Sequence, residues 1–248
     1  MHKLAKFHSK SLKDYIRNNG LEFELPDIEI CLTDGVYPVK LDSLLLAKEL
    51  AEMVKKGDKV LDIGTGAGIL AILAATQGAV VTATDVNGES IECAQHNALL
   101  NGVSLDLRLG DMFEPIEVDS FDIIVCNPPS LPSPPNEQHD EYTARSIDAG
   151  WDGRKYIDPL IEQSIKYLNK KSGHLLIVHS NFADVGKTRE KLESLGFEVD
   201  VKEYDFPVGG TSGLRVNYFL ENLPHNCHPF LKKGKWYQRI GVFRATLK

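Results

Sequence analysis

The sequence predicts an α/β fold built on a seven-stranded, mostly parallel sheet whose last strand is antiparallel. Two observations support this prediction. From residue 59 onward, short apolar segments alternate with helical segments at the spacing of βαβ units. The first apolar segment, residues 59–63, ends at a glycine-rich turn before a helix, as strands do at the ligand-binding edge of a parallel sheet. The 248 residues suffice for one such domain with a complete core.

The first 42 residues are too few for a separate folding unit. We expect residues 1–42 to form a short cap on the main domain, which spans residues 43–248. A helix is predicted over residues 12–17. Asp42 has the side chain of an N-cap and is predicted to begin a helix over residues 43–55.

The remaining elements follow from glycine punctuation and apolar patterning. Glycine stands directly after several helical segments, in the place where a helix ends, as at Gly57, Gly78 and Gly196. Apolar or alternating runs between these helices read as buried strands. The predicted strands cover residues 59–63, 80–84, 105–109, 121–126, 174–179, 197–203 and 236–246, and the predicted helices cover residues 67–77, 89–100, 156–168 and 184–195.

Two segments compete for the last strand, residues 215–220 and 236–246. We assign 236–246 because it alternates better and follows a Lys-Gly turn. Residues 204–235 then form an insertion that contains a helix over 214–222. Since the preceding strand is parallel to the others, the insertion leaves the sheet at the same edge as the glycine turn. It is a candidate substrate lid, and the alternative is a surface excursion without ligand contact.

The glycine turn indicates a ligand that carries a positive group. Its pattern is Asp62-x-Gly64-x-Gly66-x-Gly68, whereas a dinucleotide fingerprint would need glycine where Ile69 stands. Glycines let a ligand approach main-chain N–H groups closely. An acid beside the turn repels phosphate and attracts an ammonium group.

A second acid supports a nucleoside ligand. Asp85 ends the next strand 21 positions after Gly64, near the roughly 20-residue offset at which an acid binds ribose hydroxyls. At this point the chain resembles class I S-adenosylmethionine-dependent methyltransferases, whose first motif matches residues 62–68. The resemblance implies a Rossmann-like class I methyltransferase fold and S-adenosyl-L-methionine as the cofactor.

The resemblance also implies roles for individual residues. Asp111 could bind the adenine amine, or it could instead cap a helix. The cofactor-binding residues implied are Asp62, Gly64, Thr65, Gly66 and Gly68 for the amino-acid tail, Asp85 and Val86 for the ribose, Asp111 and Met112 for the adenine, and Asn127 beside the methyl group.

Asn127-Pro128-Pro129-Ser130 directly follows the buried strand 121–126 and is the candidate catalytic segment. Two prolines remove two N–H donors and fix φ, which leaves carbonyl acceptors beside the asparagine amide. Such a fork suits the N–H hydrogens of an incoming nitrogen whose lone pair must face an electrophile, so that catalysis is mainly orientation. The alternative is an ordinary strand-ending turn.

In this context the chain resembles HemK-like methyltransferases, which methylate protein glutamine amides, and more loosely amino-directed nucleobase methyltransferases. The turn at residues 35–38 with Asp42 and the glycine-rich segment 149–153 also resemble that family. The family's tetrad normally ends in an aromatic residue, and Ser130 cannot stack on a planar amide. The N-terminal segment is also too short to match the helical domain that bacterial glutamine methyltransferases use.

These departures favour a nitrogen of a small-molecule or amino-acid-like substrate over the alternative of a protein glutamine or lysine side chain. Two other functions stay open. The protein could transfer or cyclise the aminocarboxypropyl arm of the cofactor, which would leave methylthioadenosine instead of S-adenosylhomocysteine. It could also be a non-catalytic binding scaffold.

Other side chains are weaker candidates. Tyr37, Tyr142 and Trp151 lie in predicted loops at the ligand edge, where an aromatic ring could face a sulfonium, although core packing is the alternative for each. His179 could line the pocket or be a satisfied surface histidine. No metal is expected, because the His225-Asn226-Cys227-His228 run lacks a second pair at ligand spacing.

Composition limits the partners. The formal net charge is −7 and the pI is about 5.6, so a nucleic-acid partner is disfavoured. No apolar run approaches the roughly 18 residues that span a bilayer, and no secretory leader is evident. The four cysteines are scattered, as reduced thiols are. We therefore expect a cytoplasmic protein without a membrane partner.

Overall fold

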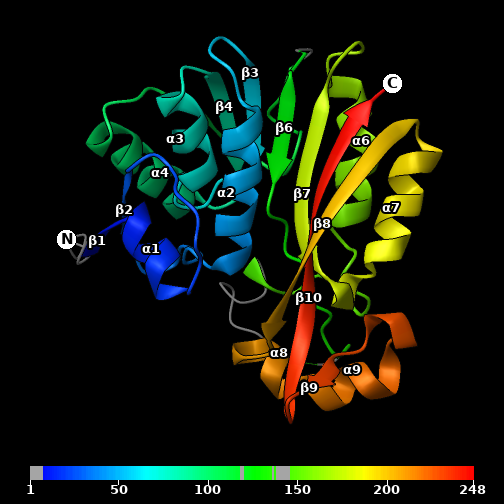
Figure 1. Cartoon of the computed structure of the whole chain (residues 1–248). Helices are drawn as coiled ribbons and strands as arrows, with labels where there is room; N and C mark the ends of the chain where they lie inside the picture. The colour runs from blue at the N-terminus through cyan, green and yellow to red at the C-terminus, as the bar shows by residue number, and fades with distance from the viewer. Residues whose placement is uncertain (1–7, 118–119, 136, 138–145) are drawn as a thin grey trace.

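A twisted sheet of eight strands forms the centre of the computed structural model, which describes residues 8–117, 120–135, 137 and 146–248 (Figure 1). The strand order is β5-β4-β3-β6-β7-β10-β8, and β9 pairs with β10 outside this path. The strands are β3 (Lys59–Ile63), β4 (Val80–Asp85), β5 (Asp106–Leu109), β6 (Ile123–Cys126), β7 (His174–Ser180), β8 (Phe197–Pro207), β9 (Phe230–Lys232) and β10 (Lys235–Leu247).

The direction of the strands confirms the predicted topology. Strands β5, β4, β3, β6 and β7 are parallel, and β10 is antiparallel to both β7 and β8, so β8 runs parallel to β7. All seven predicted strands are present. The eighth, β9, was not predicted. It forms a two-residue hairpin with β10 through Lys233 (φ +51°) and Gly234 (φ +73°), as in a type I′ turn.

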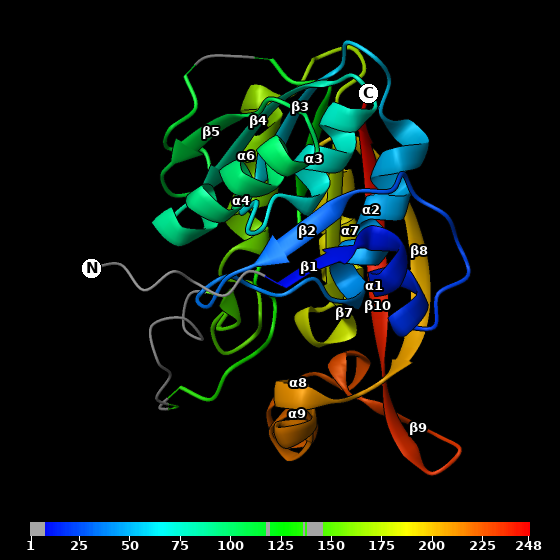
Figure 2. The same ribbon diagram turned by 90° about the vertical axis from the view of Figure 1, so that its left-hand side faces the viewer.

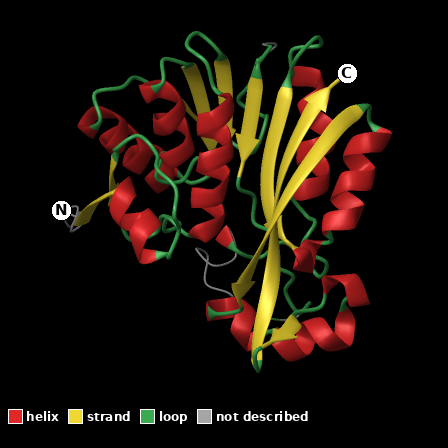
Figure 3. Cartoon of the chain, viewed as in Figure 1, coloured by secondary structure: helices red, strands yellow, loops and turns green. Residues whose placement is uncertain are grey.

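Helices of the described residues cover both faces of the sheet (Figures 1 and 3). Successive strand residues face opposite sides, so Val60 packs on the first face and Leu61 on the second. Within the described ranges, every helix is too short or too polar to pass through a bilayer. The first face carries α2 (Leu41–Met53), α3 (Ile69–Thr76) and α4 (Gly88–Leu100), and the second carries α6 (Ile157–Tyr167) and α7 (Val185–Ser194).

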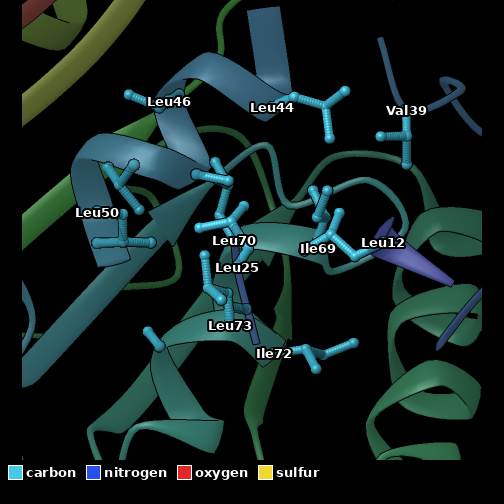
Figure 4. Packing of buried hydrophobic residues seen from close by; sticks show 14 of the residues in the cluster. Leu12, Leu25, Val39, Leu44, Leu46, Leu50, Ile69, Leu70, Ile72 and Leu73 are labelled. Atoms are coloured by element: carbon cyan, nitrogen blue, oxygen red, sulfur yellow. The ribbon is translucent and has the colours of Figure 1, made fainter. Parts of the chain in front are cut away.

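Leucine and isoleucine side chains of α2 and α3 form the centre of the first core. Leu44 and Leu50 from α2 lie beside Leu70 and Leu73 from α3 (Figure 4). All four are almost fully buried, and each contributes roughly 1.5–3 kcal/mol relative to an exposed side chain. This packing fixes the start of α2 relative to β3, whose glycine turn leads into α3.

The start of α2 corrects one prediction. The helix begins at Leu41 with Lys40 as N-cap, and no side chain caps it. Asp42 is therefore not the N-cap, because the extended backbone at Lys40 (φ −122°, ψ −179°) enters the helix two residues early. The Asp42 carboxylate instead accepts a hydrogen bond from the Ser43 backbone N–H at 2.8 Å.

The N-terminal segment packs beside α4. Strands β1 (His8–Ser11) and β2 (Glu29–Leu32) form a two-stranded antiparallel sheet around α1 (Leu12–Asn18), and Figure 2 shows this unit lying over the main domain. The Asn97 side chain bonds both backbone groups of Cys31, and the Asn101 side chain does the same at Glu29. Two asparagine side chains of α4 thus hydrogen-bond the backbone of β2, as a neighbouring strand would, and attach β2 to the helix.

Between β8 and β10 the chain extends beyond the edge at which the parallel strands end (Figures 1 and 2). The predicted helix over 214–222 is two helices, because the backbone of Arg215 (φ −101°, ψ 9°) interrupts it. Phe219 packs on Phe182 of the main domain, with ring centroids 4.3 Å apart. The helical elements between β8 and β10 are α8 (Gly210–Leu214), α9 (Val216–Asn222) and η2 (His225–Cys227). Phe182 belongs to a further short helix, η1 (Asn181–Ala183), which lies between β7 and α7.

Candidate active site

A cavity of about 1130 Å³ opens at the carboxyl edge of the parallel strands. The segments that follow β3, β4, β5 and β6 form one side of it, and the starts of α2 and α8 form the other. This is the place where open α/β sheets bind ligands. The two strongest motifs of the sequence, the glycine turn and the Asn-Pro-Pro-Ser segment, line this one cavity.

The glycine turn is shaped to bring backbone against a ligand. Gly64 and Gly66 have φ values of +70° and +54°, and a Cβ added at either would meet no atom within 4 Å. Glycine is needed here for the backbone conformation and for close approach. The N–H groups of Gly64 and Thr65 both donate to the carbonyl of Thr84, which holds the turn against β4.

Asp62 lies beneath this turn and does not line the cavity. Its side chain is 1% exposed. Oδ2 accepts hydrogen bonds from the Thr65 hydroxyl (2.7 Å) and the Ala71 backbone N–H (3.2 Å), and Oδ1 has no hydrogen-bond partner within the described chain. Burial raises the pKa of Asp62 to about 7. The carboxyl group therefore supports the turn, and its buried Oδ1 places negative potential under it.

Substituting Asp62→Asn is expected to flatten the pH dependence of stability. A carboxyl pKa raised from about 4 to about 7 on folding stabilises the protein at low pH, and this contribution is lost as pH rises through 7. The ligand-free wild type should lose on the order of 2–3 kcal/mol of unfolding free energy relative to the variant between pH 5 and pH 8. Urea unfolding of both proteins at four pH values measures this. If the unfolding free energies of wild type and variant changed equally with pH, the prediction would be wrong.

Gly68 also lies outside the cavity lining, although sequence patterning grouped it with the cofactor residues. It is the N-cap of α3 with φ +85°, and an added Cβ would lie 3.1 Å from the Cβ of Ala94 on α4. Its observed role is to let α3 approach α4 closely.

The predicted ribose and adenine residues do line the cavity. Asp85 Oδ2 accepts a hydrogen bond from the Gly66 N–H (2.9 Å) and Oδ1 accepts one from the Asn87 N–H (2.9 Å), while burial raises the pKa of Asp85. The Thr84 hydroxyl donates to the carbonyl of Met112 at 3.0 Å, which fixes the turn after β5. Val86, Asp111 and Met112 complete this side.

All four residues of the Asn127-Pro128-Pro129-Ser130 segment line the cavity at the end of β6. Asn127 Nδ2 donates to the Ser43 hydroxyl oxygen at 3.0 Å. A Cβ at Gly153 would lie 2.6 Å from the Ser130 carbonyl oxygen, so only glycine allows the 149–153 segment to pack on this backbone. The segment is thereby held from both sides.

The three aromatic candidates differ in whether they line the cavity. Tyr37 lines the cavity, and the Lys40 ammonium lies 4.6 Å from its ring centroid. Trp151 does not line the cavity, and its side chain is 60% exposed. Tyr142 lies outside the described residues.

Apart from His179, the residues of the far wall were not predicted from the sequence. This wall lies beyond Ser130, over β7 and the first part of β10. Because β10 is antiparallel, its first residues reach the edge where the parallel strands end, and this could be inferred only once the strand order was known. Four residues of the predicted insertion, 209–212, contribute to this wall, together with Tyr156, Ser180, Gln238 and Ile240.

Arg215 attaches this wall to the loop after Ser130. Its guanidinium donates to the Pro132 carbonyl (3.0 Å) and to the Ser133 hydroxyl (2.9 Å), and it pairs with Glu137 at 2.9 Å. The Arg215 side chain is only 4% exposed. The Tyr218 hydroxyl lies 3.4 Å from the Ser133 carbonyl, so two residues of the α8–α9 region contact one loop.

His179 is buried and lines the cavity, so the first of its two predicted placements is confirmed and the surface placement is wrong. Burial lowers its pKa to about 4, so the ring is neutral at pH 7. Nδ1 lies 2.9 Å from the Ser180 carbonyl and Nε2 lies 2.9 Å from the Thr188 hydroxyl, to which Arg154 also donates. Both ring nitrogens are thus committed to structure. Across the described ranges, no cluster of three or more His, Cys, Asp or Glu residues could hold a metal ion.

The charge of the lining suits a cationic nucleoside and opposes a polyphosphate. Lys40 is the one lysine or arginine among the described lining residues. Backbone N–H groups at Gly64 and Thr65 are already bonded to Thr84, so they do not form a free phosphate cradle. The acids of the lining are Asp42, Asp85, Glu89, Glu92 and Asp111.

Comparison with known proteins gives concordant matches. The family described as Methyltransferase small domain matches residues 27–144. The chain is 36% identical over 179 residues to a putative protein N5-glutamine methyltransferase of Methanocaldococcus jannaschii, which covers 72% of this chain and 89% of that protein. It is 31% identical over 153 residues to the release factor glutamine methyltransferase of Geobacter sulfurreducens, with 59% of this chain and 54% of that protein covered.

Among solved structures, the T. thermophilus 16S rRNA N2 G1207 methyltransferase in complex with AdoMet and guanosine matches with a TM-score of 0.58. The match covers 98% of this chain and 51% of that chain at 17% identity. At this identity the likeness concerns the fold alone.

Proposed function

The chain belongs to the HemK-like class I methyltransferases, and from this premise we propose that it methylates the side-chain amide nitrogen of glutamine in a polypeptide. The methyl donor proposed is S-adenosyl-L-methionine, as expected for an enzyme of this family. The observation that carries the proposal is that the acceptor-rich Asn-Pro-Pro segment and the glycine turn line one cavity.

The glycine side of the cavity fits this cofactor. The acidic lining and the unpaired Asp62 Oδ1 beneath the turn favour a ligand with ammonium and sulfonium charges. We assign Gly64, Thr65 and Gly66 to the amino-acid tail, with Asp62 and Gly68 as supports of the turn. The ribose is assigned to Asp85 and Val86, the adenine to Asp111 and Met112. When bound, the cofactor supplies an electrophilic methyl group.

Asn127 and Pro128 would orient the acceptor. A primary amide has two N–H hydrogens, and the Asn127 side-chain oxygen and the Pro128 carbonyl are two acceptors without a competing backbone donor at residues 128 and 129. Holding both hydrogens directs the face of the nitrogen toward the methyl group. Alignment of this kind can account for a large part of the rate, since no further covalent step is needed.

The relatives favour a polypeptide acceptor over the small molecule that the sequence alone favoured. The relatives from M. jannaschii and G. sulfurreducens are both named as glutamine methyltransferases. Ser130 lacks the ring that would stack on the amide, and the wall beyond it, including Ser180 and Gln238, offers polar groups in its place. The chain spans about half the length of the G. sulfurreducens relative, so the proposal names the amide and not a particular polypeptide.

A methylation assay with defined acceptors tests the proposal. We expect S-adenosylmethionine to bind in calorimetry, and mass spectrometry to detect one methyl group on an unstructured glutamine peptide with release of S-adenosylhomocysteine. The matched peptides carry asparagine or lysine at the same place, and free glutamine tests a small acceptor. Release of methylthioadenosine, or methylation of lysine or free glutamine alone, would contradict the proposal.

A further inference from the structure

The side chain of Asn127 contacts the start of α2, 84 residues earlier in the chain. Nδ2 donates to the Ser43 hydroxyl at 3.0 Å, and the Asn127 amide also lies near enough to the Asp42 carboxylate to favour its charged form. The Ser43 backbone N–H donates to Asp42 Oδ1 at 2.8 Å and fixes the carboxylate in turn. The segment expected to hold the acceptor is therefore coupled to a helix from outside the parallel strands.

The two contacts differ in what they require of the amide. A hydroxyl can donate or accept, so Ser43 is compatible with either orientation of the Asn127 amide. An ionised carboxylate only accepts, so it favours the orientation in which NH2 faces α2. With NH2 turned to Asp42, Oδ1 points away from α2. Hydrogen bonds to a charged group are also the stronger kind, so Asp42 dominates the choice.

We propose that Asp42 is a positioning residue, which presents the Asn127 side-chain oxygen to the acceptor nitrogen and makes that oxygen a stronger hydrogen-bond acceptor. The second effect arises because hydrogen bonds in a chain polarise one another. In the transfer an N–C bond would form as the S–C bond breaks and S-adenosylhomocysteine leaves, and the acceptor nitrogen would be positive until one N–H proton passes to solvent. The carboxylate acts on this charge through the amide. This inference rests on the proposed function.

The local structure argues against a purely structural role for Asp42. The helix begins at Leu41 with Lys40 as its N-cap, so Asp42 lies in the first turn and does not cap the helix. Burial raises the pKa of Asp42, while the hydrogen bonds from the Ser43 N–H and the Asn127 side chain act in the opposite direction. A carboxylate in such a place is costly unless its charge is used or compensated. Its charge is compensated by backbone N–H groups, by the Asn127 side chain and by Lys40, and of these Asn127 is the one in the candidate catalytic segment.

Substituting Asp42→Asn tests the inference, because the new side chain keeps the shape and removes the charge. We expect the single-turnover rate constant of methyl transfer to fall about tenfold or more, with the Kd for S-adenosylmethionine changed by less than about threefold. Ser43→Ala should cost only about two- to fivefold. Glu52→Ala, which removes an exposed carboxylate from the same helix, is the control and should retain the wild-type rate.

A double-mutant cycle separates positioning from a general effect on the fold. In an Asn127→Ala background, Asp42→Asn should have almost no further effect, because the residue through which Asp42 acts is gone. The same tenfold loss in that background would overturn the inference. So would an Asp42→Asn enzyme within twofold of the wild-type rate.

A measurement on the free protein keeps this test independent of the acceptor. The side-chain NH2 resonances of Asn127, assigned by their absence in Asn127→Ala, should exchange with solvent more slowly in the wild type than in Asp42→Asn. Equal exchange rates would overturn the inference whatever the acceptor is. A wild type with slow exchange that binds S-adenosylmethionine and methylates no glutamine peptide would instead contradict the proposed function.

Discussion

Substituting Asn127→Ala is expected to lower kcat by about 10²–10³-fold while the Kd for S-adenosylmethionine stays within about threefold of wild type. The alanine removes the side-chain oxygen that we assign to the acceptor, and losing a positioned group of this kind typically costs two to three orders of magnitude. The glycine turn, which we assign to the cofactor tail, lies at the end of a different strand. Single-turnover kinetics and calorimetry measure the two quantities separately.

Asn169→Ala is the matched control. Asn169 also has a partly buried side-chain amide, which donates to Asp122 Oδ1 at 3.1 Å, and it lies at the opposite edge of the sheet from the cavity. This variant loses an amide hydrogen bond without touching the proposed site, so kcat should be unchanged. If Asn127→Ala weakened cofactor binding by as much as it lowered kcat, the assignment of Asn127 to the acceptor would be wrong.

Substituting Gly64→Val is expected to weaken S-adenosylmethionine binding by about 100-fold or more. The isopropyl group would project into open cavity space, where we place the amino-acid tail. Displacing part of a ligand and shielding the backbone it contacts removes several favourable contacts at once, and two orders of magnitude correspond to about 3 kcal/mol. Calorimetry at a temperature well below the unfolding transition measures this.

Gly102→Val distinguishes backbone strain from loss of the ligand site. Gly102 has φ +67°, close to the +70° of Gly64, and a Cβ there also meets no atom within 4 Å. It follows α4 and lies outside the cavity lining. Both variants should lose similar stability, since a β-branched residue is strained at positive φ. Equal loss of cofactor affinity in both would contradict the assignment of Gly64, and Gly64→Ala provides a milder variant if the valine protein unfolds.

The succession of strands and helices along the chain, and the position of the two main motifs, could be predicted from the sequence because local patterns determine them. Glycines after β3 and prolines after β6 act on their own backbone, and parallel strands bring their carboxyl ends to one edge. Strand β9 was missed because three residues carry almost no periodic signal. The hairpin turn at Lys233-Gly234 was the available clue.

The roles of single side chains depended on tertiary packing and were less predictable. Asp62 and Gly68 belong to the motif by spacing, yet one is buried beneath the turn and the other packs α3 on α4. Trp151 was expected in a loop at the ligand edge, but its side chain faces solvent. Asp42 was expected to cap a helix, and its contact with Asn127 joins positions 85 residues apart, which no local pattern encodes.

The long pairing of β8 with β10 has a consequence for diversification of this enzyme. The two strands are in register from Phe197 paired with Leu247 to Pro207 paired with Tyr237. The chain between them therefore leaves and re-enters the sheet at adjacent points, and changing its length costs little closure entropy. Residues 208–229 can therefore differ in length without disturbing the register of β8 and β10. Because four of them, 209–212, line the cavity, such a change would reshape its far wall and leave the glycine turn in place.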